Sequence, residues 1–280
     1  MGILNVTADS FSDGGQWLEP DDAVGHGLKM AAKGADVIDV GGESTRPGSR
    51  RIPADEQASR ILTVIERLRH QLDQRHPNVA ISVDTTLADV ATAALDTGAD
   101  MINDVSAGRE DRRMLDLAAA RRAPIVLMHM QGTPATMQQA PRYDDVVREV
   151  EAFLIERAEA AVAAGVSREQ ILIDPGIGFG KTRAHNLALL ARLDQLANTG
   201  FAVLLGTSRK RFMGSICQQS DGSAPPPSSL VGATCATTAL GVAGRVAMFR
   251  VHDVRANRQA AEVAWNILDA ESQMARDELR

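Results

Sequence analysis

Short runs of apolar and β-branched residues alternate with longer amphipathic stretches along the whole chain. The short runs predict eight strands, at residues 2–6, 37–40, 80–83, 101–103, 125–128, 171–173, 203–205 and 246–251. The longer stretches predict helices between them, at 21–33, 54–75, 88–97, 112–120, 144–164, 186–198, 231–242 and 257–280. Strands of a parallel sheet are buried on both faces and therefore read as continuous apolar runs of this kind. The alternation predicts an α/β protein with a wholly parallel sheet.

The number of strand–helix units indicates how that sheet is arranged. An open doubly wound sheet gives the same alternation, but eight units in 280 residues favour a closed (β/α)8 TIM barrel over residues 1–280. Gly34, Gly98, Gly165 and Gly200 each follow an amphipathic stretch, where a left-handed helix end suits glycine. The segment 219–229 is rich in Ser and Pro and is predicted to be a mobile loop within the one domain.

Composition and charge narrow the function classes. The chain is 44% hydrophobic and 24% charged, which excludes collagen-like and disordered classes. A net charge of −6 with mixed signs gives no indication of a nucleic-acid or membrane partner. Two cysteines make no disulfide framework, and we find neither a signal peptide nor an apolar stretch of the ~18 residues that a membrane span needs. We expect a cytoplasmic protein.

Polar residues gather where the predicted strands end. In a barrel of this type the carboxyl ends of the strands meet at one mouth, where active sites lie. A single Asp, Asn or Ser at such a junction is more often a helix cap, but eight polar strand ends indicate a functional site. These junctions comprise residues 5–13, 41–48, 84–85, 103–104, 129, 174–176, 208–210 and 250–253.

Lysines and aromatic residues are scarce, so each position is informative. The chain has four lysines, and two of them, Lys181 and Lys210, fall on predicted mouth loops. An ammonium group is not replaced by guanidinium, so Lys210 is a candidate for chemistry, although drift towards Arg explains the scarcity equally well. Phe11 and Phe179 lie in Gly- and Ser-rich loops, where a ring is suited to a planar ligand.

Two other patterns suggest sites that we do not expect. The segment 176–182 resembles a phosphate loop, but Pro175 stands where that motif needs Gly. His129, Asp104 and Glu43 lack the spacing of a transition-metal site. A magnesium ion that bridges a phosphate-bearing substrate stays open, because Mg²⁺ needs few protein ligands.

Seven motifs in order resemble the dihydropteroate synthases, a family of pterin-binding barrels in folate synthesis. The motifs are MGILNVTADSFSDGG at 1–15, DVGGESTRPG at 39–48, SVDT at 82–85, ND at 103–104, DPG at 174–176, SRK at 208–210 and RVHD at 250–253. The resemblance covers nearly the whole chain and implies a TIM barrel. It also implies that p-aminobenzoate is joined to (7,8-dihydropterin-6-yl)methyl diphosphate, with release of diphosphate.

The resemblance also implies roles for particular residues. Pterin binding is implied for Asp84, Asn103, Asp174, Lys210, Phe179 and Arg250. Diphosphate binding is implied for Asn5, Thr45, Arg46, Arg250 and His252, with Mg²⁺ on Asn5. Aminobenzoate would be bordered by Phe11, Thr45, Pro47, Ser208 and Lys210. The catalytic set implied is Lys210, Asp84, Asp174, Arg250, His252 and Asp13, with Asp13 and Arg46 on loops that close over the site.

Some features depart from this family, and alternatives stay open. Ala8 stands where the family usually has Pro, Thr207 where it often has an apolar residue, and a β-hairpin that usually plugs the barrel floor is not seen before the first strand.

The related methyltetrahydrofolate–corrinoid methyltransferases share the barrel but not the Thr45–Arg46–Pro47 loop. A non-catalytic pterin-binding paralogue is the second alternative. Family members are homodimers through late helices, and the Ala-rich face over 233–243 suits either a partner or the chain's own barrel.

Overall fold

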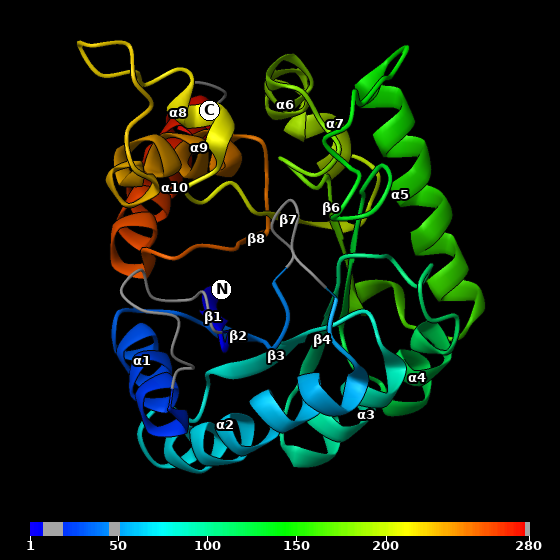
Figure 1. Cartoon of the computed structure of the whole chain (residues 1–280). Helices are drawn as coiled ribbons and strands as arrows, with labels where there is room; N and C mark the ends of the chain where they lie inside the picture. The colour runs from blue at the N-terminus through cyan, green and yellow to red at the C-terminus, as the bar shows by residue number, and fades with distance from the viewer. Residues whose placement is uncertain (8–18, 45–50, 278–280) are drawn as a thin grey trace.

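The eight predicted strands form one parallel sheet, in which each strand pairs with its neighbours in the sequence (Figure 1). The structure, a computed structural model, describes residues 1–7, 19–44 and 51–277. The strands are β1 (Gly2–Asn5), β2 (Val37–Gly41), β3 (Ala80–Asp84), β4 (Met101–Asp104), β5 (Ile125–Met128), β6 (Ile171–Asp174), β7 (Ala202–Leu205) and β8 (Met248–Phe249). All the ladders are parallel, as the continuous apolar runs predict.

The sheet closes on itself through the residues that follow β8. Val251 forms a parallel bridge with Gly2 of the first strand. The Ile3 amide donates to the Val251 carbonyl at 3.0 Å, and the Val251 amide donates to the Met1 carbonyl at 3.0 Å. The architecture is therefore a (β/α)8 TIM barrel, and the open doubly wound alternative is wrong.

Helices cover the outside of the barrel, one or more after each strand (Figure 1). They are α1 (Pro20–Ala32), α2 (Ala54–Arg75), α3 (Ala88–Thr97), α4 (Arg113–Arg121), α5 (Val146–Ala163), α6 (Arg183–Leu190), α7 (Leu193–Ala197), α8 (Arg211–Gly214), α9 (Val231–Ala243) and α10 (Val254–Asp277). The four glycines predicted to end helices all have positive φ, which confirms that prediction.

Three element predictions differ from the structure. The helix predicted over 186–198 is two helices, because Arg192 leaves the helical conformation at φ −132° and ψ 30°. The short α8 was missed, since four residues carry no helical period. The strand predicted over 246–251 pairs with β7 only at Met248–Phe249, since Val251 has already crossed to β1.

Side chains that point into the barrel change from apolar to polar along β2, β4 and β6. At the amino ends an apolar layer fills the interior, formed by Met1, Val37, Met101, Val126, Leu172 and Leu204. Two residues further on, each strand presents its next inward position. Val37 is followed by Asp39, Met101 by Asn103 and Leu172 by Asp174. The fold therefore rests the polar mouth on a closed apolar floor.

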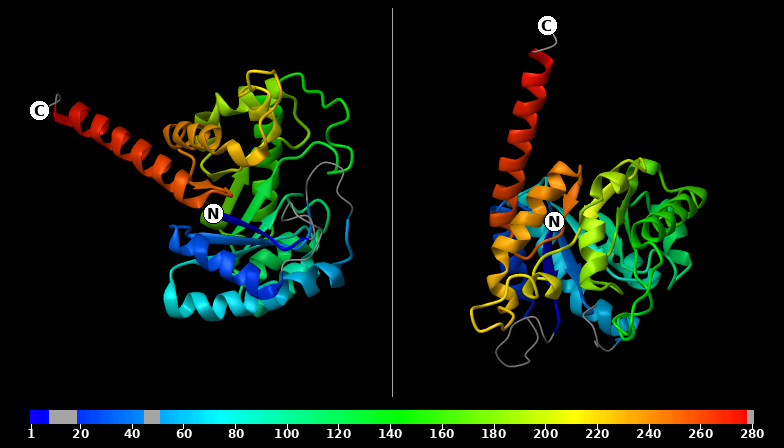
Figure 2. Two further views of the ribbon diagram at one scale, coloured as in Figure 1. Left: turned by 60° about the vertical axis from the view of Figure 1, so that its left-hand side comes forward. Right: turned by 90° about the horizontal axis from the view of Figure 1, so that it is seen from above.

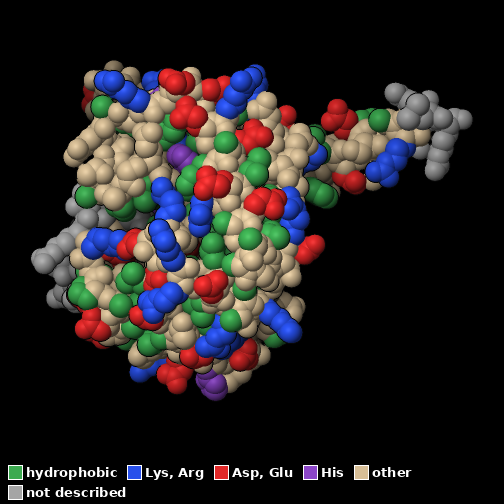
Figure 3. All heavy atoms as spheres, turned by 90° about the vertical axis from the view of Figure 1, so that its right-hand side faces the viewer, with side chains coloured by type: hydrophobic (Ala, Val, Ile, Leu, Met, Phe, Trp, Pro, Cys, Tyr) green, Lys and Arg blue, Asp and Glu red, His purple; other side chains and the backbone are tan. Residues whose placement is uncertain are grey.

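The last helix extends well beyond the barrel. Figure 2 shows α10 projecting from the body and carrying the C-terminal end, with its first turns against α9. On the face shown in Figure 3, basic and acidic side chains are interspersed over the body. Among the described helices, none is long and apolar enough to cross a membrane. The segment 219–229 lies largely exposed between α8 and α9 and contains the short 3-10 helix Pro227–Ser229; its mobility stays a prediction.

Candidate active site

Five of the predicted site residues form one connected group at the carboxyl ends of the strands. Strand β3 ends at Asp84 and β6 at Asp174, and Asn103 is the second-last residue of β4. Each of the three side chains is less than a tenth exposed. Arg250 follows β8 and donates through Nη2 to Asp84 Oδ2 at 2.7 Å. Lys210 follows β7 and interacts electrostatically with both Asp174 and Arg250. The structure therefore brings these five predicted residues together at the mouth, and their binding roles stay predictions.

Asp39, which the sequence prediction did not assign to the site, links this group from below. Its Oδ2 accepts hydrogen bonds from Arg250 Nε at 2.6 Å and from Asn103 Nδ2 at 3.1 Å, and the residue is fully buried. Its Oδ1 and the Ser82 Oγ beside it on β3 are buried without a hydrogen-bond partner among the described residues. The signal in the sequence was a carboxylate at an inward position of an otherwise apolar strand.

Burial and neighbouring charges shift the pKa values of the acidic groups of the site. Burial raises the pKa of Asp84 to about 7; Arg250 opposes this rise, and the Asp39 carboxylate adds to it. Burial likewise raises the pKa of Asp174, against the attraction of Lys210. Asp84 is therefore close to its point of ionisation at neutral pH, and at both carboxyl groups a ligand that donates hydrogen bonds stabilises the charged form.

The pKa values of the two cations of the site, Lys210 and Arg250, are shifted in opposite directions. Burial lowers the pKa of Lys210 to about 8, although Asp174 opposes the change. Burial also acts to lower the pKa of Arg250, but the negative charges of Asp39 and Asp84 outweigh it and raise that pKa above the ordinary range. Arg250 is thus a permanent cation, whereas Lys210 can gain or lose a proton near neutral pH.

The segments after β7 and β8 are held together at the rim. The Ser208 Oγ accepts from the His252 amide at 3.1 Å and lies 2.9 Å from His252 Nδ1. Arg209 makes a two-point ion pair with Asp253, at 3.0 and 2.8 Å. Ser208, predicted to border aminobenzoate, and His252, predicted to bind diphosphate, therefore lie in contact. Asn5 ends β1 on the neighbouring side of the barrel and is half-buried.

The loop 176–181 faces the site and does not form a phosphate cradle. Its amides are used within the protein: that of Gly176 donates to Asp174 Oδ1, that of Gly178 to Asn186 Oδ1, and that of Phe179 to the Gly176 carbonyl. The Phe179 ring centroid lies 4.3 Å from Lys210 Nζ. These amides are therefore already used within the protein, and Phe179 lies beside Lys210.

The metal cluster that His129, Asp104 and Glu43 suggest is not formed. Asp104 accepts from the amides of Ser106 and Gly108, and Glu43 accepts from Gln57. Within residues 1–7, 19–44 and 51–277, no group of three His, Cys, Asp or Glu side chains could hold a metal ion.

Several predicted site residues lie outside the described part of the chain. They are Phe11, Asp13, Thr45, Arg46 and Pro47, together with Ala8. Their proposed positions around the mouth stay predictions.

The chain is similar to proteins of one family along almost its entire length. A family profile described as "Pterin binding enzyme" matches residues 1–252. The dihydropteroate synthase of Mycobacterium leprae is 48% identical over 268 residues, which cover 95% of this chain and 92% of that protein. The Xanthomonas albilineans dihydropteroate synthase solved with 4-aminobenzoic acid has a TM-score of 0.85 at 45% identity, covering 96% of this chain and 92% of that chain. The Yersinia pestis enzyme, solved in a sulfonamide drug complex, has a TM-score of 0.87 at 39% identity, with 96% and 93% covered.

Fold, site and similarity agree on the class: the chain belongs to the pterin-binding enzymes. Its buried carboxylates and cations lie at the strand ends where this barrel carries its chemistry. Its function is that of a dihydropteroate synthase, a transferase of folate synthesis.

Proposed function

We propose that Asp84, Asn103, Asp174, Lys210 and Arg250 bind the pterin ring of (7,8-dihydropterin-6-yl)methyl diphosphate. The observation that supports this proposal is the connected group of buried acceptors and cations at the mouth. The aminopyrimidinone edge of a pterin carries N–H donors, which carboxylates and the Asn103 amide oxygen can accept. A pocket whose buried acceptors need such donors rejects rings that lack them.

The reaction breaks one C–O bond and forms one C–N bond. Departure of diphosphate leaves a positively charged carbon that the pterin ring stabilises, and the arylamine nitrogen attacks that carbon and then loses a proton. Arg250 and His252 favour the negative charge that develops on the departing diphosphate, so their help is greatest in the transition state. Asp84 and Asp174 stabilise the electron-poor ring.

We propose magnesium as the cofactor of diphosphate release, held through Asn5. Since the described residues form no cage of metal-binding side chains, the ion would be bound mainly by substrate diphosphate oxygens and water. This fits Mg²⁺, which keeps several waters and uses few protein ligands, and the Asn5 amide oxygen at the end of β1 is a suitable one. When bound, Mg²⁺ supplies charge neutralisation on the departing oxygens.

We propose that p-aminobenzoate lies against Ser208, opposite the pterin. Ser208 Oγ is fixed by the His252 amide, which sets its direction at the rim. The similar Xanthomonas albilineans enzyme was solved with 4-aminobenzoic acid, and the Yersinia pestis enzyme with a sulfonamide drug. Sulfonamides resemble aminobenzoate in shape, so this chain is proposed as a sulfonamide target.

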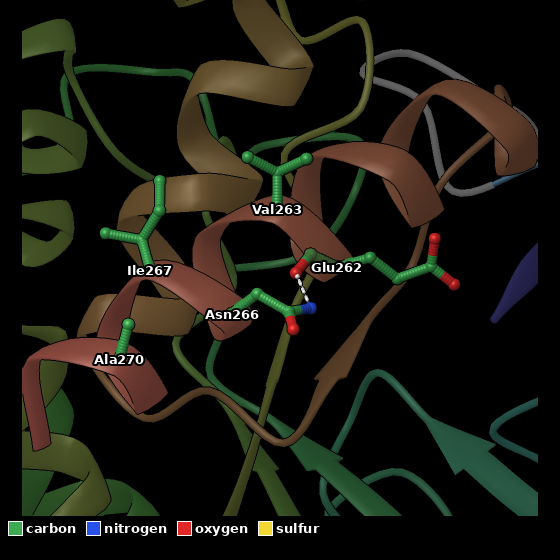
Figure 4. A pocket seen from close by; sticks show the side chains of 5 residues that line it. All are labelled: Glu262, Val263, Asn266, Ile267 and Ala270. Carbon is green, nitrogen blue, oxygen red and sulfur yellow. Dashed lines mark hydrogen bonds between the residues drawn. The ribbon is translucent and has the colours of Figure 1, made fainter. Parts of the chain in front are cut away.

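We propose a homodimer through α9 and α10. Large apolar side chains are exposed on these helices: Leu240 is 66% exposed, Val263 61%, Trp265 67% and Ile267 62%. Exposed apolar groups of this kind are typical of interaction surfaces. Figure 4 shows the shallow pocket on α10 lined by Glu262, Val263, Asn266, Ile267 and Ala270. A sedimentation experiment that finds only monomer would contradict the proposal.

The test of the reaction is the coupling of radiolabelled p-aminobenzoate to the pterin diphosphate, with and without Mg²⁺. We expect labelled dihydropteroate and one equivalent of diphosphate, and a large loss when the ion is chelated and recovery when it is restored. Binding of the pterin without coupling would favour the non-catalytic alternative. Methyl transfer from methyltetrahydrofolate to a corrinoid would favour the methyltransferase alternative.

A further inference from the structure

Lys181 is a buried lysine outside the group that binds the substrate in the proposal above, and burial lowers its pKa to about 7. It is 3% exposed, and among the described residues the Asp174 carboxylate attracts it electrostatically without a direct ion pair. Instead, its Nζ donates to the carbonyls of Gly176 at 3.1 Å and Phe179 at 3.0 Å, and lies 2.9 Å from His129 Nδ1. A buried ammonium without a paired carboxylate is costly, so these acceptors stabilise the charged form of Lys181.

His129 completes a closed set of contacts with the site. Burial, together with the Lys181 charge, lowers the pKa of His129 to about 3, so its ring is neutral and Nδ1 accepts from the ammonium. The His129 amide donates to the Asp174 carbonyl at 2.9 Å, and Asp174 Oδ1 accepts from the Gly176 amide at 2.7 Å. Because the Gly176 carbonyl returns to Lys181, the lysine is connected to both the backbone and the side chain of Asp174.

The same loop touches Lys210. The Ile177 carbonyl accepts from Lys210 Nζ, and the Phe179 ring lies on that ammonium. A Cβ at Gly178 would lie 2.8 Å from Lys210 Cδ, so the loop backbone packs directly on the lysine chain. At the other side of the loop, a Cβ at Gly176 would collide with the His129 carbonyl oxygen. The loop is therefore packed between the end of β5 and Lys210, with little freedom to shift.

We propose that Lys181 is a positioning residue of the pterin site: its ammonium holds the loop 176–181 against the end of β5 and so sets the positions of Asp174, Phe179 and Lys210. This inference rests on the proposed pterin site. Lys181 is 3% exposed, so it acts through the loop whose carbonyls it contacts. Groups that orient ligating side chains in this way contribute about 10- to 100-fold to affinity or activity at metal sites, and we expect a similar effect here.

The test compares Lys181→Met with the matched control Lys33→Met, an exposed lysine on the outside of the barrel. Calorimetric titration gives the Kd for the pterin diphosphate, and separate titration gives the Kd for inorganic diphosphate. We expect K181M to weaken pterin diphosphate binding by at least about tenfold, with inorganic diphosphate binding within about twofold of the wild type. K33M should match the wild type for both ligands.

Two results would overturn the inference. One is a K181M protein that is less heat-stable but binds pterin diphosphate as the wild type does, which would mean a structural role only. If K181M does not fold, the wild-type chain labelled with ¹⁵N-lysine gives four Nζ signals, assigned with variants of the other lysines. Pterin diphosphate should then shift the Lys181 signal along with that of Lys210, and an unmoved Lys181 signal is the second overturning result. A wild type that binds no pterin diphosphate would instead refute the proposed function.

Discussion

Replacing Asp39 by Asn tests the most deeply buried ion pair of the mouth. Asn keeps the size and an acceptor for Arg250 Nε but removes one of the two carboxylates that balance the guanidinium. Leaving a buried charge uncompensated costs about 3–5 kcal/mol of stability. Since Asp84 still pairs with Arg250 and Arg250 is about one-fifth exposed, we take the lower end, about 3 kcal/mol. For a domain of this size that corresponds to a melting temperature lower by about 6–12 °C.

The matched control is Asp36→Asn, at the residue directly before β2 and three positions before Asp39. Asp36 pairs with Arg258 at 3.1 Å, but the two side chains are 77% and 41% exposed, and exposed pairs contribute about 0–1 kcal/mol. Urea and thermal unfolding, followed by circular dichroism, give both free energies of unfolding. If D39N is no less stable than D36N, the buried network does not stabilise the mouth as argued. A second readout is pterin affinity, which D39N should weaken because a neutral amide holds Arg250 and Asn103 less strongly than the carboxylate does.

Three further outcomes follow from the site. Lys210→Ala should lower kcat for dihydropteroate formation by about 10²-fold or more while leaving the circular dichroism spectrum unchanged, because it removes a preorganised cation; near-normal turnover would contradict its role. Because burial lowers the pKa of Lys210 to about 8, raising the pH through 8 should deprotonate it, so kcat/KM for the pterin substrate should fall there; a flat profile from neutral pH upwards would refute this. Sulfonamides should inhibit in competition with p-aminobenzoate, and full activity at saturating drug would exclude the proposed position beside Ser208.

Much of the fold could be predicted from the hydrophobic pattern. Continuous apolar runs mark strands buried on both faces, and glycines mark helix ends, so strand order and parallel pairing were predicted correctly. The break at Arg192 could not be predicted, because apolar residues continue at helical spacing on both sides of it. The shortness of β8 could not be predicted either, since it depends on where the barrel closes onto Gly2.

The site was predicted through its position at strand ends more than through single residues. Asp84, Asn103 and Asp174 stand where apolar runs stop, which makes them visible in the sequence. Asp39 lies inside a run, and only the two-residue period of a strand shows that it points into the barrel below Arg250. Lys181 was expected on a mouth loop, but its burial could not be predicted, because it depends on contacts with His129, which is 52 positions away.

The proposed binding of the pterin ring among Asp84, Asn103, Asp174 and Lys210 can be seen in a crystal structure of this chain with (7,8-dihydropterin-6-yl)methyl diphosphate. We expect the aminopyrimidinone edge within hydrogen-bond distance of the Asp84 and Asp174 carboxylates, and the diphosphate towards Arg250 and His252. A ring bound elsewhere, or bound at the mouth without contact to either carboxylate, would contradict it.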